Sequence, residues 1–551
     1  METTRFILLL SLGLVLMLIW QAWQMDYGLV PAHADEKKTT RIPESPGRPD
    51  ISATPGVTLQ SDPTLPPPAS MAETVPGARL SIDTDVYHIE IDTLGGSIRH
   101  VSLIDYPVSK DKPEIPYILL DDNPEHFFIA QGGLLGQKDA PTHETLYQAE
   151  QTSYRLAENE EVLQVALRWT SVNGTVVTKI YKFYRGKYLF DVSYEIINKS
   201  PDPWTGQAYG QLQRIESSGD DTRFVKTYTG AVISRPDKRY EKISFEDIRE
   251  EKLSQDISNG WASMQQHYFL AALIPATATE EYHYYTLALD DNRFAIGSIS
   301  PGLILQPGQS GSITSRLYIG PKDQKELGRI AEGLDLTVDY GVFWFIAKPL
   351  FWCLDKIHLY TNNWGWSIIL VTVLIKILFY KLSAASYRSM ANMRRVQPRL
   401  LVLRDRYKDD RARLNQAMME IYKKEKINPL GGCFPILIQI PVFISLYWVL
   451  LESVELRQAV FIFWIRDLSG PDPFFVLPVV MGVSMYVQQK LNPAPLDPVQ
   501  EKVMSFLPIM FTVFFAFFPS GLVLYWVVNN ILSIAQQWLI IHNLEHPASR
   551  A

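Results

Sequence analysis

The sequence predicts an α-helical polytopic membrane protein with six spans and a separate all-β domain, and three observations support this fold class. The 551 residues divide by composition: roughly the first 340 are mostly polar and acidic apart from the N-terminus, whereas apolar runs dominate from Phe343 onward. Several of these runs reach about 20 residues, which a membrane helix needs and a soluble core does not. Residues 77–338 instead show the short alternating stretches of β-strands.

The chain begins with a candidate transmembrane anchor at residues 1–24. Arg5 precedes an apolar run from Phe6 to Trp23, which favours an uncleaved signal anchor. A cleavable signal peptide stays open, because an Ala-His-Ala sequence further on resembles a cleavage site. That sequence lies far beyond the apolar run, however, and the run is long for a signal peptide. With either alternative, the chain emerges on the outer face of the membrane.

A linker and a β domain follow the anchor. Residues 25–76 are rich in Pro, Ser, Thr, Asp and Glu and contain few large apolar residues, which predicts a disordered tether. Within residues 77–338, apolar and polar residues alternate, for example at 163–169, and the Asn-Gly pair at 173–174 is a strong hairpin signal. Many strands separated by turn signals predict a β-sandwich.

The ionisable residues of the β domain form no pattern that is typical of a catalytic or metal site. His88 and His100 lack the spacing of metal ligands, and both cysteines, Cys353 and Cys433, lie outside the domain, which excludes a disulfide framework there. We therefore expect a structural or docking role for this domain, with ligand binding as the alternative. For the whole chain we predict no enzymatic activity, no catalytic residues, no metal site and no cofactor.

Residues 339–362 precede the first span of the membrane domain. They are apolar and aromatic but include Lys348, Pro349 and Asp355, which interrupt the run. An amphipathic helix in the membrane interface is expected here, and a poorly formed spanning helix is the alternative.

The loop after the second span sets the predicted orientation. It contains twelve Lys or Arg against five Asp or Glu, a net charge of +7, and the positive-inside rule places such a loop in the cytoplasm. Both termini are then cytoplasmic, and the β domain lies in the periplasm of a Gram-negative inner membrane. The predicted order is TM2 at 363–382, a cytoplasmic helical hairpin at 383–430, TM3 at 431–451, a periplasmic loop at 452–473, TM4 at 474–490, a cytoplasmic loop at 491–502, TM5 at 503–518, a periplasmic turn at 519–520, TM6 at 521–541 and a cytoplasmic tail at 542–551.

The basic loop is predicted to fold as two antiparallel helices. Apolar residues recur at intervals of three and four on both sides of the sequence "YKDDR" at 407–411, which predicts a turn between two helices. A basic hairpin of this kind can meet ribosomal RNA or anionic lipid. The alternative is a solvated surface that only fixes the topology.

Lys376 lies inside the second span, six residues from its cytoplasmic end and therefore about 9 Å deep. A lysine at this depth could simply snorkel to the headgroups. However, polar residues of other spans also lie in the cytoplasmic half of the membrane, whereas the periplasmic halves of the spans are markedly apolar. Because polar groups in a membrane face protein or water, these residues predict a hydrophilic recess open to the cytoplasm and closed outside. The predicted polar lining is Thr372, Gln439, Asn530, Ser533 and Gln537.

Three segments closely resemble the YidC membrane protein insertases. They are "NPLGGCFPILIQIPVFISLYWVL" (428–450), "SVELRQAVFIFWIRDLSGPDPFFVLPVVMGVSMYVQQK" (453–490) and "FFPSGLVLYWVVNNILSIAQQWLI" (517–540). The similarity covers about 340–541. The order of anchor, linker, large β domain, interfacial helix and five further spans is similar to the Gram-negative branch of that family, in which the periplasmic domain is a β-supersandwich.

The resemblance implies a five-helix insertase core with a groove that is open to the cytoplasm and to lipid. Lys376 would supply the groove charge that attracts hydrophilic parts of a nascent membrane protein. The apolar part of the substrate would slide along the third and fifth spans, and the candidate slide residues are Phe443, Phe506, Tyr525 and Trp526. The cytoplasmic hairpin would recruit substrates, and its candidate residues are Arg394, Arg395, Arg404, Arg406, Arg411 and Arg413.

The implied partners are nascent membrane proteins, the Sec translocon and the lipid bilayer, with the ribosome as a further candidate and no DNA.

The chain departs from the family at two positions. Lys376 stands where an arginine is usual, so the charge is kept but the guanidinium fork is lost. Trp526 stands where the family has a substrate-contact tyrosine, so an aromatic surface is kept and a hydroxyl is lost.

Two other function classes remain for comparison. A secondary transporter that uses Lys376 as its titrating group would need ionisable partners in other spans, and none of the predicted spans contains Asp or Glu. A scaffold whose working part is the β domain would lose its function when that domain is removed. An insertase needs no nucleotide, which agrees with the lack of a Walker-type loop in the sequence.

Overall fold

The computed structural model describes residues 77–136, 140–216, 227–407, 410–425, 434–492 and 498–545. These residues fall into two compact units, one made of residues within 396–427 and the other of all remaining described residues, and each is described by itself. The predicted anchor, linker and cytoplasmic tail end, together with Cys433, lie outside the described residues.

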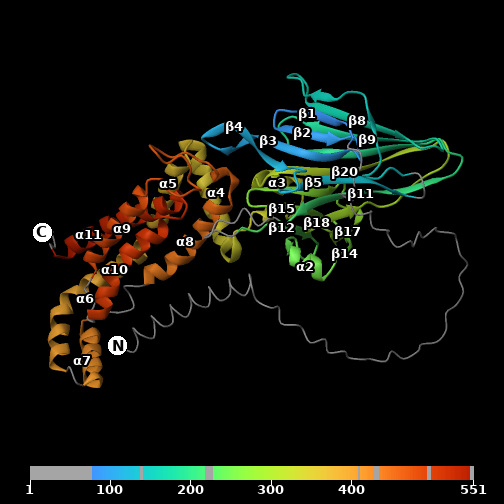
Figure 1. Cartoon of the computed structure of the whole chain (residues 1–551). Helices are drawn as coiled ribbons and strands as arrows, with labels where there is room; N and C mark the ends of the chain where they lie inside the picture. The colour runs from blue at the N-terminus through green and yellow to red at the C-terminus, as the bar shows by residue number, and fades with distance from the viewer. Residues whose placement is uncertain are drawn as a thin grey trace, which may run out of the picture. The chain divides into compact units, whose positions relative to one another are not determined.

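The β domain is built from two large sheets that face one another (Figure 1). In the 11-stranded sheet, β1 and β7 pair in parallel and the other neighbours are antiparallel. The order of its strands is β14 (Ser254–Ser258), β17 (Glu281–Ala288), β18 (Arg293–Ile299), β11 (Trp204–Ile215), β5 (Phe128–Gly136), β3 (Ser97–Ser109), β2 (Tyr87–Asp92), β1 (Arg79–Asp83) and β7 (Ser153–Arg155), with β19 (Leu303–Leu305) on β11 and β4 (Lys112–Leu120) on β3.

The second sheet has nine strands, all antiparallel. Their order is β13 (Glu241–Ile243), β12 (Gly230–Ser234), β15 (Trp261–Gln265), β16 (Phe269–Pro275), β20 (Ser310–Pro321), β10 (Leu189–Asn198), β9 (Thr175–Tyr184), β8 (Val162–Thr170) and β6 (Gln148–Ala149). A short helix, α2 (Phe245–Glu250), lies between β13 and β14. The β-sandwich that the alternating pattern predicts is therefore confirmed.

The predicted hairpin joins β8 and β9. Val162 pairs with Tyr184 and Thr170 with Val176, and Gly174 in the turn has a φ of +96°, a backbone conformation that favours glycine. The residues at 163, 165 and 167 are buried between the sheets, while their neighbours in the strand are exposed. The period of two in the sequence thus places one face of β8 in the core of the sandwich.

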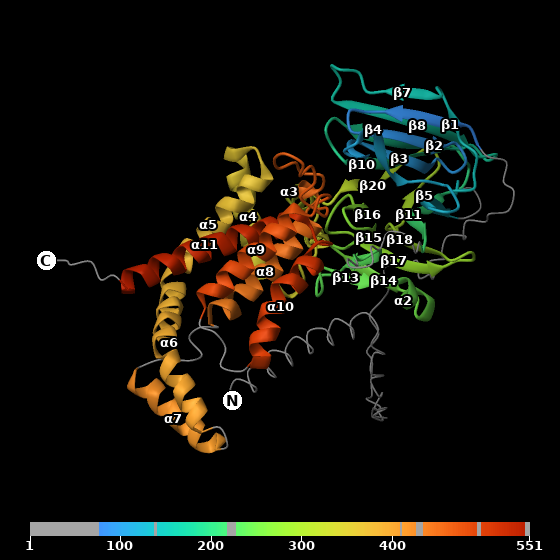
Figure 2. The ribbon, with the colours of Figure 1, turned by 60° about the vertical axis from the view of Figure 1, so that its left-hand side comes forward.

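The C-terminal half of the chain is helical. Both views show α8 (Phe434–Glu452), α9 (Val476–Leu491), α10 (Pro498–Phe515) and α11 (Ser520–Glu545) beside one another (Figures 1 and 2). The remaining elements of this part are α3 (Gln324–Ile330), two short 3-10 helices (Leu334–Thr337 and Gly341–Phe343), α4 (Trp344–Thr361), α5 (Trp364–Leu378), α6 (Tyr380–Arg406), α7 (Arg411–Lys424) and a further 3-10 turn (Val454–Leu456).

The described helices support fewer spans by length and composition than the six predicted. Ser520–Asn543 of α11 is long and apolar enough to cross a bilayer, and α5 and α6 would together make a second such segment. Ile438–Glu452 of α8 is apolar but shorter. The count of six spans therefore stays a prediction.

A sharp break separates α5 from α6. The two helices meet at Phe379 at an angle of 68°, and no proline or glycine stands there. The Phe379 amide donates to the carbonyls of both Ile375 and Ile377, which tightens the last turn of α5. The helix that begins the basic loop thus starts at Tyr380, three residues before the predicted boundary at 383, and Lys376 lies in the final turn of α5.

The smaller unit contains the end of α6 together with α7. Asp410 caps α7 by accepting from the Arg413 amide at 3.0 Å, and Arg399 of α6 forms an ion pair with Glu425 at 2.9 Å. The two helices lie on either side of the sequence at 407–411, as the apolar spacing predicts.

The loop after α8 contacts the β domain through Arg457. Its guanidinium lies over the rings of Tyr117 and Phe269, 5.6 Å and 5.5 Å from their centroids, and donates to the Pro107 carbonyl at 2.8 Å. Nearby, the ring of His267 is 2.8 Å from the Leu451 carbonyl. These contacts join two sheet strands and the β3–β4 hairpin to the end of α8.

Candidate functional site

The predicted groove residue Lys376 contacts the last long helix. From the final turn of α5, its ammonium group donates to the Ser533 hydroxyl of α11 at 2.7 Å. That hydroxyl donates in turn to the Asn529 carbonyl at 2.7 Å, one turn earlier in α11. Lys376 is half-buried, and no carboxylate of the described chain pairs with it. A positive charge is thus fixed between two helices by neutral partners alone.

Gln439 of α8 contacts the same part of α11. Its side-chain amide donates to the Asn529 side chain and lies 3.5 Å from the Tyr525 hydroxyl. Gln439 and Asn529 are both half-buried, so part of each polar group stays open to its surroundings. Lys376, Gln439, Asn529 and Ser533 together form a polar, positively charged surface between α5, α8 and α11, which we call the groove cluster.

The other predicted lining residues do not join the groove cluster. Asn530 is 3% exposed and donates to the Ser484 hydroxyl of α9 at 2.9 Å. Gln537 donates to the Leu491 carbonyl at the end of α9, at 3.2 Å. Thr372 is 0% exposed and donates to the Ile368 carbonyl of its own helix at 2.6 Å. Asn530 and Gln537 thus join α11 to α9, and Thr372 is buried against its own helix, so none of the three lines an open surface.

Helix geometry explains why one predicted polar face divides into two. With about 100° per residue, positions 530 and 537 point within about 20° of each other, toward α9. Position 529 lies about 100° from position 530, and position 533 lies between them, about 40° from 529. Asn529 was therefore missed because an i, i+3, i+7 spacing groups its neighbour Asn530 with Ser533 and Gln537. The adjacent Asn-Asn pair was the signal that two faces of the helix are polar.

Three of the four predicted slide residues meet in one aromatic cluster. The ring of Phe443 in α8 lies 4.7 Å from that of Trp526, edge to face, and 6.3 Å from that of Tyr525. Trp526 is 4.9 Å from Phe515 and 6.2 Å from Phe511, both of α10. These distances are typical of aromatic packing.

Phe506 lies apart from that cluster, 62% exposed in the middle of α10. Sequence reasoning chose this phenylalanine and missed Phe511 and Phe515. The spacing of 511, 515 and 518 at i, i+4 and i+7 would have identified them, because such residues share one face of a helix. Phe518 indeed lies 5.1 Å from Phe515.

The arginines of the basic hairpin have different surroundings. Arg413 pairs with Asp410 at 3.3 Å, and the Arg406 guanidinium lies 5.9 Å from the ring centre of Tyr407. Arg404 lies on the same stretch of α6, and the side chain of Arg411 lies outside the described residues. Arg394 and Arg395 belong to the larger unit, where they are exposed on α6.

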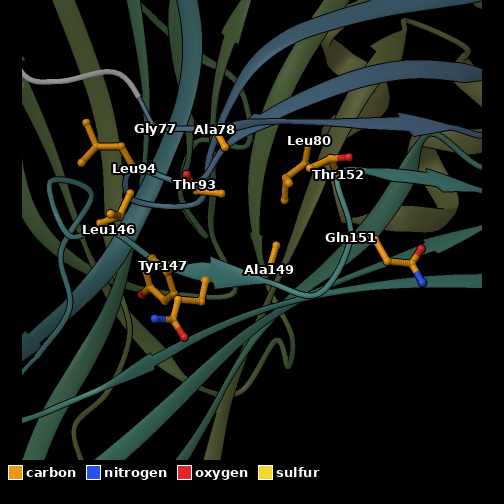
Figure 3. Close-up of a pocket in the computed structure, with 11 residues that line it drawn as sticks. Gly77, Ala78, Leu80, Thr93, Leu94, Leu146, Tyr147, Ala149, Gln151 and Thr152 are labelled. Carbon is orange, nitrogen blue, oxygen red and sulfur yellow. The ribbon is translucent and has the colours of Figure 1, made fainter.

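The β domain contains a hollow of about 620 Å³ beside the start of β1 (Figure 3). Side chains from β1, from the turn after β2 and from the β6–β7 connection surround it, and the lining includes Leu80, Leu94, Leu146, Tyr147 and Gln151. None of its described lining residues is Asp, Glu, His, Lys or Arg, so the hollow offers no acid–base pair. Across the described part of the chain, no group of three or more His, Cys, Asp or Glu could hold a metal ion.

Comparison with known proteins places the whole chain in one family. A family model described as the YidC periplasmic domain matches residues 79–353, and one described as the 60Kd inner membrane protein matches residues 356–547. The membrane protein insertase YidC of Methylococcus capsulatus is 50% identical over 557 residues, with 100% of both chains covered. The chain belongs to the YidC family. The insertase YidC of Thioalkalivibrio sulfidiphilus is 49% identical over 561 residues and 99% of each chain.

Membership of the YidC family confirms the resemblance noted in the sequence and extends it to the full length. As a family member the chain is an inner membrane protein, and its β domain is the family's periplasmic domain, since β1 to β20 lie within the matched residues. Membrane insertion makes or breaks no covalent bond, so the family is not one of enzymes.

Proposed function

We propose that this YidC family member inserts nascent membrane proteins into the inner membrane through the groove cluster, alone or with the Sec translocon, and assists their folding. The groove opens to the cytoplasm, where both chain termini and the α6–α7 hairpin lie. Six spans cross the membrane, and α4 lies in its outer interface. The hairpin arginines contact the incoming chain or the ribosome.

The uncompensated charge of Lys376 is the observation that carries this proposal. A charged side chain inside a membrane is costly and normally pairs with another group or faces water. Lys376 has a neutral hydroxyl partner and no carboxylate among the described residues, and it remains half-buried. The charge is therefore available to an acidic or strongly polar segment of a substrate that enters the groove.

The aromatic cluster offers a path for the apolar part of the substrate. Trp526 and Phe443 are half-buried and lie next to Gln439 and Tyr525, so an apolar surface borders the polar one. A substrate helix that leaves water for lipid gains about 25 cal/mol for each Å² of apolar surface buried. The membrane potential adds about 2.3 kcal/mol per 100 mV for each acidic residue moved outward. These terms supply the driving force without a nucleotide.

Photocrosslinking from single positions to a ribosome-stalled nascent chain tests the proposal. A photoreactive amino acid at Gln439 or Trp526 should crosslink to the substrate, whereas one at Thr372 should not, because that side chain is fully buried. The same probe at Phe506 measures how far the apolar path extends along α10. Equal crosslinking at Thr372, or none at Gln439 and Trp526, would contradict the groove.

Removal of residues 35–335 distinguishes an insertase from a scaffold protein that works through its β domain. Insertion of a small two-span substrate should largely survive this deletion, because the groove cluster comes entirely from α5, α8 and α11. Complete loss of insertion, with the shortened chain still present in the membrane, would favour the scaffold.

A further inference from the structure

A second cavity, of about 430 Å³, lies between the middle of α6 and the ends of α9 and α11. Arg394 and Arg395 come from α6, Leu491 from the end of α9, and Trp538 and His542 from the last turns of α11. Ala391 and Ile541 complete its lining. This cavity is separate from the groove cluster, none of whose residues lines it.

The polar half of the cavity suits a phosphate group. Two consecutive guanidinium groups meet there, and none of the described lining residues is acidic. Guanidinium groups bind phosphate oxygens through paired, charge-assisted hydrogen bonds. The imidazole of His542 stacks on the indole of Trp538, with ring centres 5.4 Å apart and planes 9° from parallel. Both rings can donate N–H groups to the same anion.

The other half of the cavity is apolar, which distinguishes its ligand from a soluble anion. Leu491, Ile541 and Ala391 line it alongside the arginines. Trp538 is 56% exposed, and exposed apolar side chains continue along both neighbouring helices, with Leu539 on α11 and Val487 on α9. A ligand that uses both halves carries a phosphate next to hydrocarbon, which is the structure of a phospholipid at the level of its headgroup.

The place of the cavity in the fold agrees with this chemistry. It lies at the final turns of α9 and α11, which the proposed orientation places at the cytoplasmic surface of the membrane. Tryptophan is enriched at this level, and basic pockets between membrane helices on this side bind acidic lipid headgroups. The inference rests on the proposed function only for this choice of leaflet.

We propose that the cavity binds the headgroup of an anionic phospholipid, phosphatidylglycerol in the simplest case, through Arg394 and Arg395, with Trp538 beside the glycerol backbone. The bound lipid fixes the middle of α6 against α9 and α11. Two of the six hairpin arginines therefore also hold the hairpin to the membrane.

Native mass spectrometry of the full chain in detergent tests the site, with dioleoyl-phosphatidylglycerol and dioleoyl-phosphatidylcholine as probes. The double variant Arg394→Gln/Arg395→Gln should bind phosphatidylglycerol about tenfold more weakly, because charge-assisted hydrogen bonds to the phosphate are lost. The matched double variant Arg404→Gln/Arg406→Gln carries the same charge change on α6 outside the cavity and should bind like the parent chain. Phosphatidylcholine should bind weakly to all three proteins.

Four results would overturn the proposal. Equal losses in both double variants would mean that only net charge attracts the lipid, and equal binding of the two lipids by the parent chain would exclude an anion site. A short single-stranded RNA that binds the parent chain and competes with phosphatidylglycerol would assign the arginines to nucleic acid. A variant with Lys at both positions should regain most of the binding, and failure to regain it in a folded protein counts against the site.

The assay needs no translation, so it is independent of insertion. A chain that binds phosphatidylglycerol but inserts no substrate would contradict the proposed function and leave the lipid site in place.

Discussion

The ammonium group of Lys376 and the hydroxyl of Ser533 lie 2.7 Å apart and join α5 to α11. Ser533 is nearly fully buried, whereas Lys376 is half-buried, so the contact fixes one end of the lysine side chain without enclosing it. The hydroxyl satisfies one of the three ammonium donors. Gln439 and Asn529 complete the groove cluster on α8 and α11.

The sign of the charge at position 376 should decide which substrates are inserted. Lys376→Arg should insert all substrates nearly as well as the parent chain. Lys376→Glu should reduce insertion of substrates with acidic translocated segments at least about fivefold, because two unit charges 4 Å apart interact by about 1 kcal/mol in water and by more at lower dielectric. Protease protection of the translocated segment in membrane vesicles measures the yield.

Ser533→Ala serves as the control for this charge series. It removes the hydrogen-bond partner of Lys376 but keeps the positive charge, so insertion of acidic substrates should fall by less than in Lys376→Glu. Equal insertion of acidic substrates by the Glu variant and the parent chain would show that the groove does not attract charge.

Cysteine accessibility should separate two adjacent asparagines of α11. Asn529→Cys should react with a membrane-impermeant thiol reagent added from the cytoplasmic side, because Asn529 is half-buried beside Gln439. Asn530→Cys should react at least about tenfold more slowly, since Asn530 is nearly fully buried against Ser484. Cys353 and Cys433 are first replaced by serine, and labelling is followed by mass shift.

The neighbouring positions extend this map. Cysteines in place of Lys376 and Gln439 should label, and a cysteine in place of Thr372 should not. Fast labelling at 530 and 372 together with slow labelling at 529 would reverse the assignment of the open face of α11.

Much of the β domain follows from local sequence patterns. The strand β8 and its turn into β9 could be predicted because alternation and an Asn-Gly pair act over a few residues. The pairing of β11 with β5 and β18, by contrast, joins segments far apart in the chain. Nothing in a local pattern specifies such partners, so the sheet order could not be predicted.

The candidate site was predictable in kind but not in detail. Polar residues in the inner halves of the spans indicated a recess, and Lys376 and Ser533 do contact each other. Which polar residue faces which helix depends on rotations of tens of degrees, and those are set by tertiary packing. Asn530 and Gln537 contact α9 for this reason. The break at Phe379 was also invisible, because it has no proline or glycine.

The aromatic cluster should depend on ring surface rather than on a hydroxyl at position 526. Trp526→Tyr should keep insertion near the parent level, whereas Trp526→Ala should lower crosslinking of an apolar substrate segment to position 443 at least about threefold. The Ala variant loses contacts with Phe443 and Phe515, and an aromatic pair contributes about 0.5–1.5 kcal/mol beyond its buried area. Yield of the crosslinked product on gels measures the effect.

Phe463→Ala is the matched control for this series. Phe463 is also an aromatic residue of the membrane domain, but it lies in the loop after α8, where it is strongly exposed and contacts Trp464. Crosslinking from position 443 should not change in this variant. An equal loss in both Ala variants would mean that any aromatic residue of this domain has the same effect.

Arg457 should stabilise the contact between the β domain and the end of α8. Arg457→Ala removes a hydrogen bond to Pro107 and the contacts with Tyr117 and Phe269, which should lower the free energy of unfolding by about 1–3 kcal/mol. Pulse proteolysis of the full chain across a urea series measures the change.

Arg466→Ala provides the comparison within the same loop. Arg466 is 72% exposed and pairs with the exposed Asp111 at 3.3 Å, so its removal should change stability by less than about 0.5 kcal/mol. A larger loss from Arg466→Ala than from Arg457→Ala would contradict the assignment of the contact to Arg457.

Acid should weaken the β domain through His143. The Nδ1 atom of this buried imidazole lies 2.5 Å from the Tyr209 hydroxyl oxygen, and burial, together with the charges of Lys179 and Arg99, lowers the pKa of His143 to about 4. The unfolded chain binds a proton near pH 6.5, whereas the folded chain resists it. The folded state therefore loses up to about 3 kcal/mol of stability as pH falls from 6.5 to 4. Pulse proteolysis at several pH values measures how the free energy of unfolding changes with pH.

The pH dependence of the free energy of unfolding arises from His143 only if a neutral side chain at this position removes it. His143→Gln should lose stability at pH 7 but show a flatter pH dependence between 4 and 6.5, because no proton binds at that position. His267 has a pKa lowered to about 4 by burial and by Lys322, so His267→Gln should remove a second share of the slope. If both variants keep the parent pH dependence, the acid sensitivity arises from carboxylates instead, since their protonation below pH 5 also destabilises folded chains.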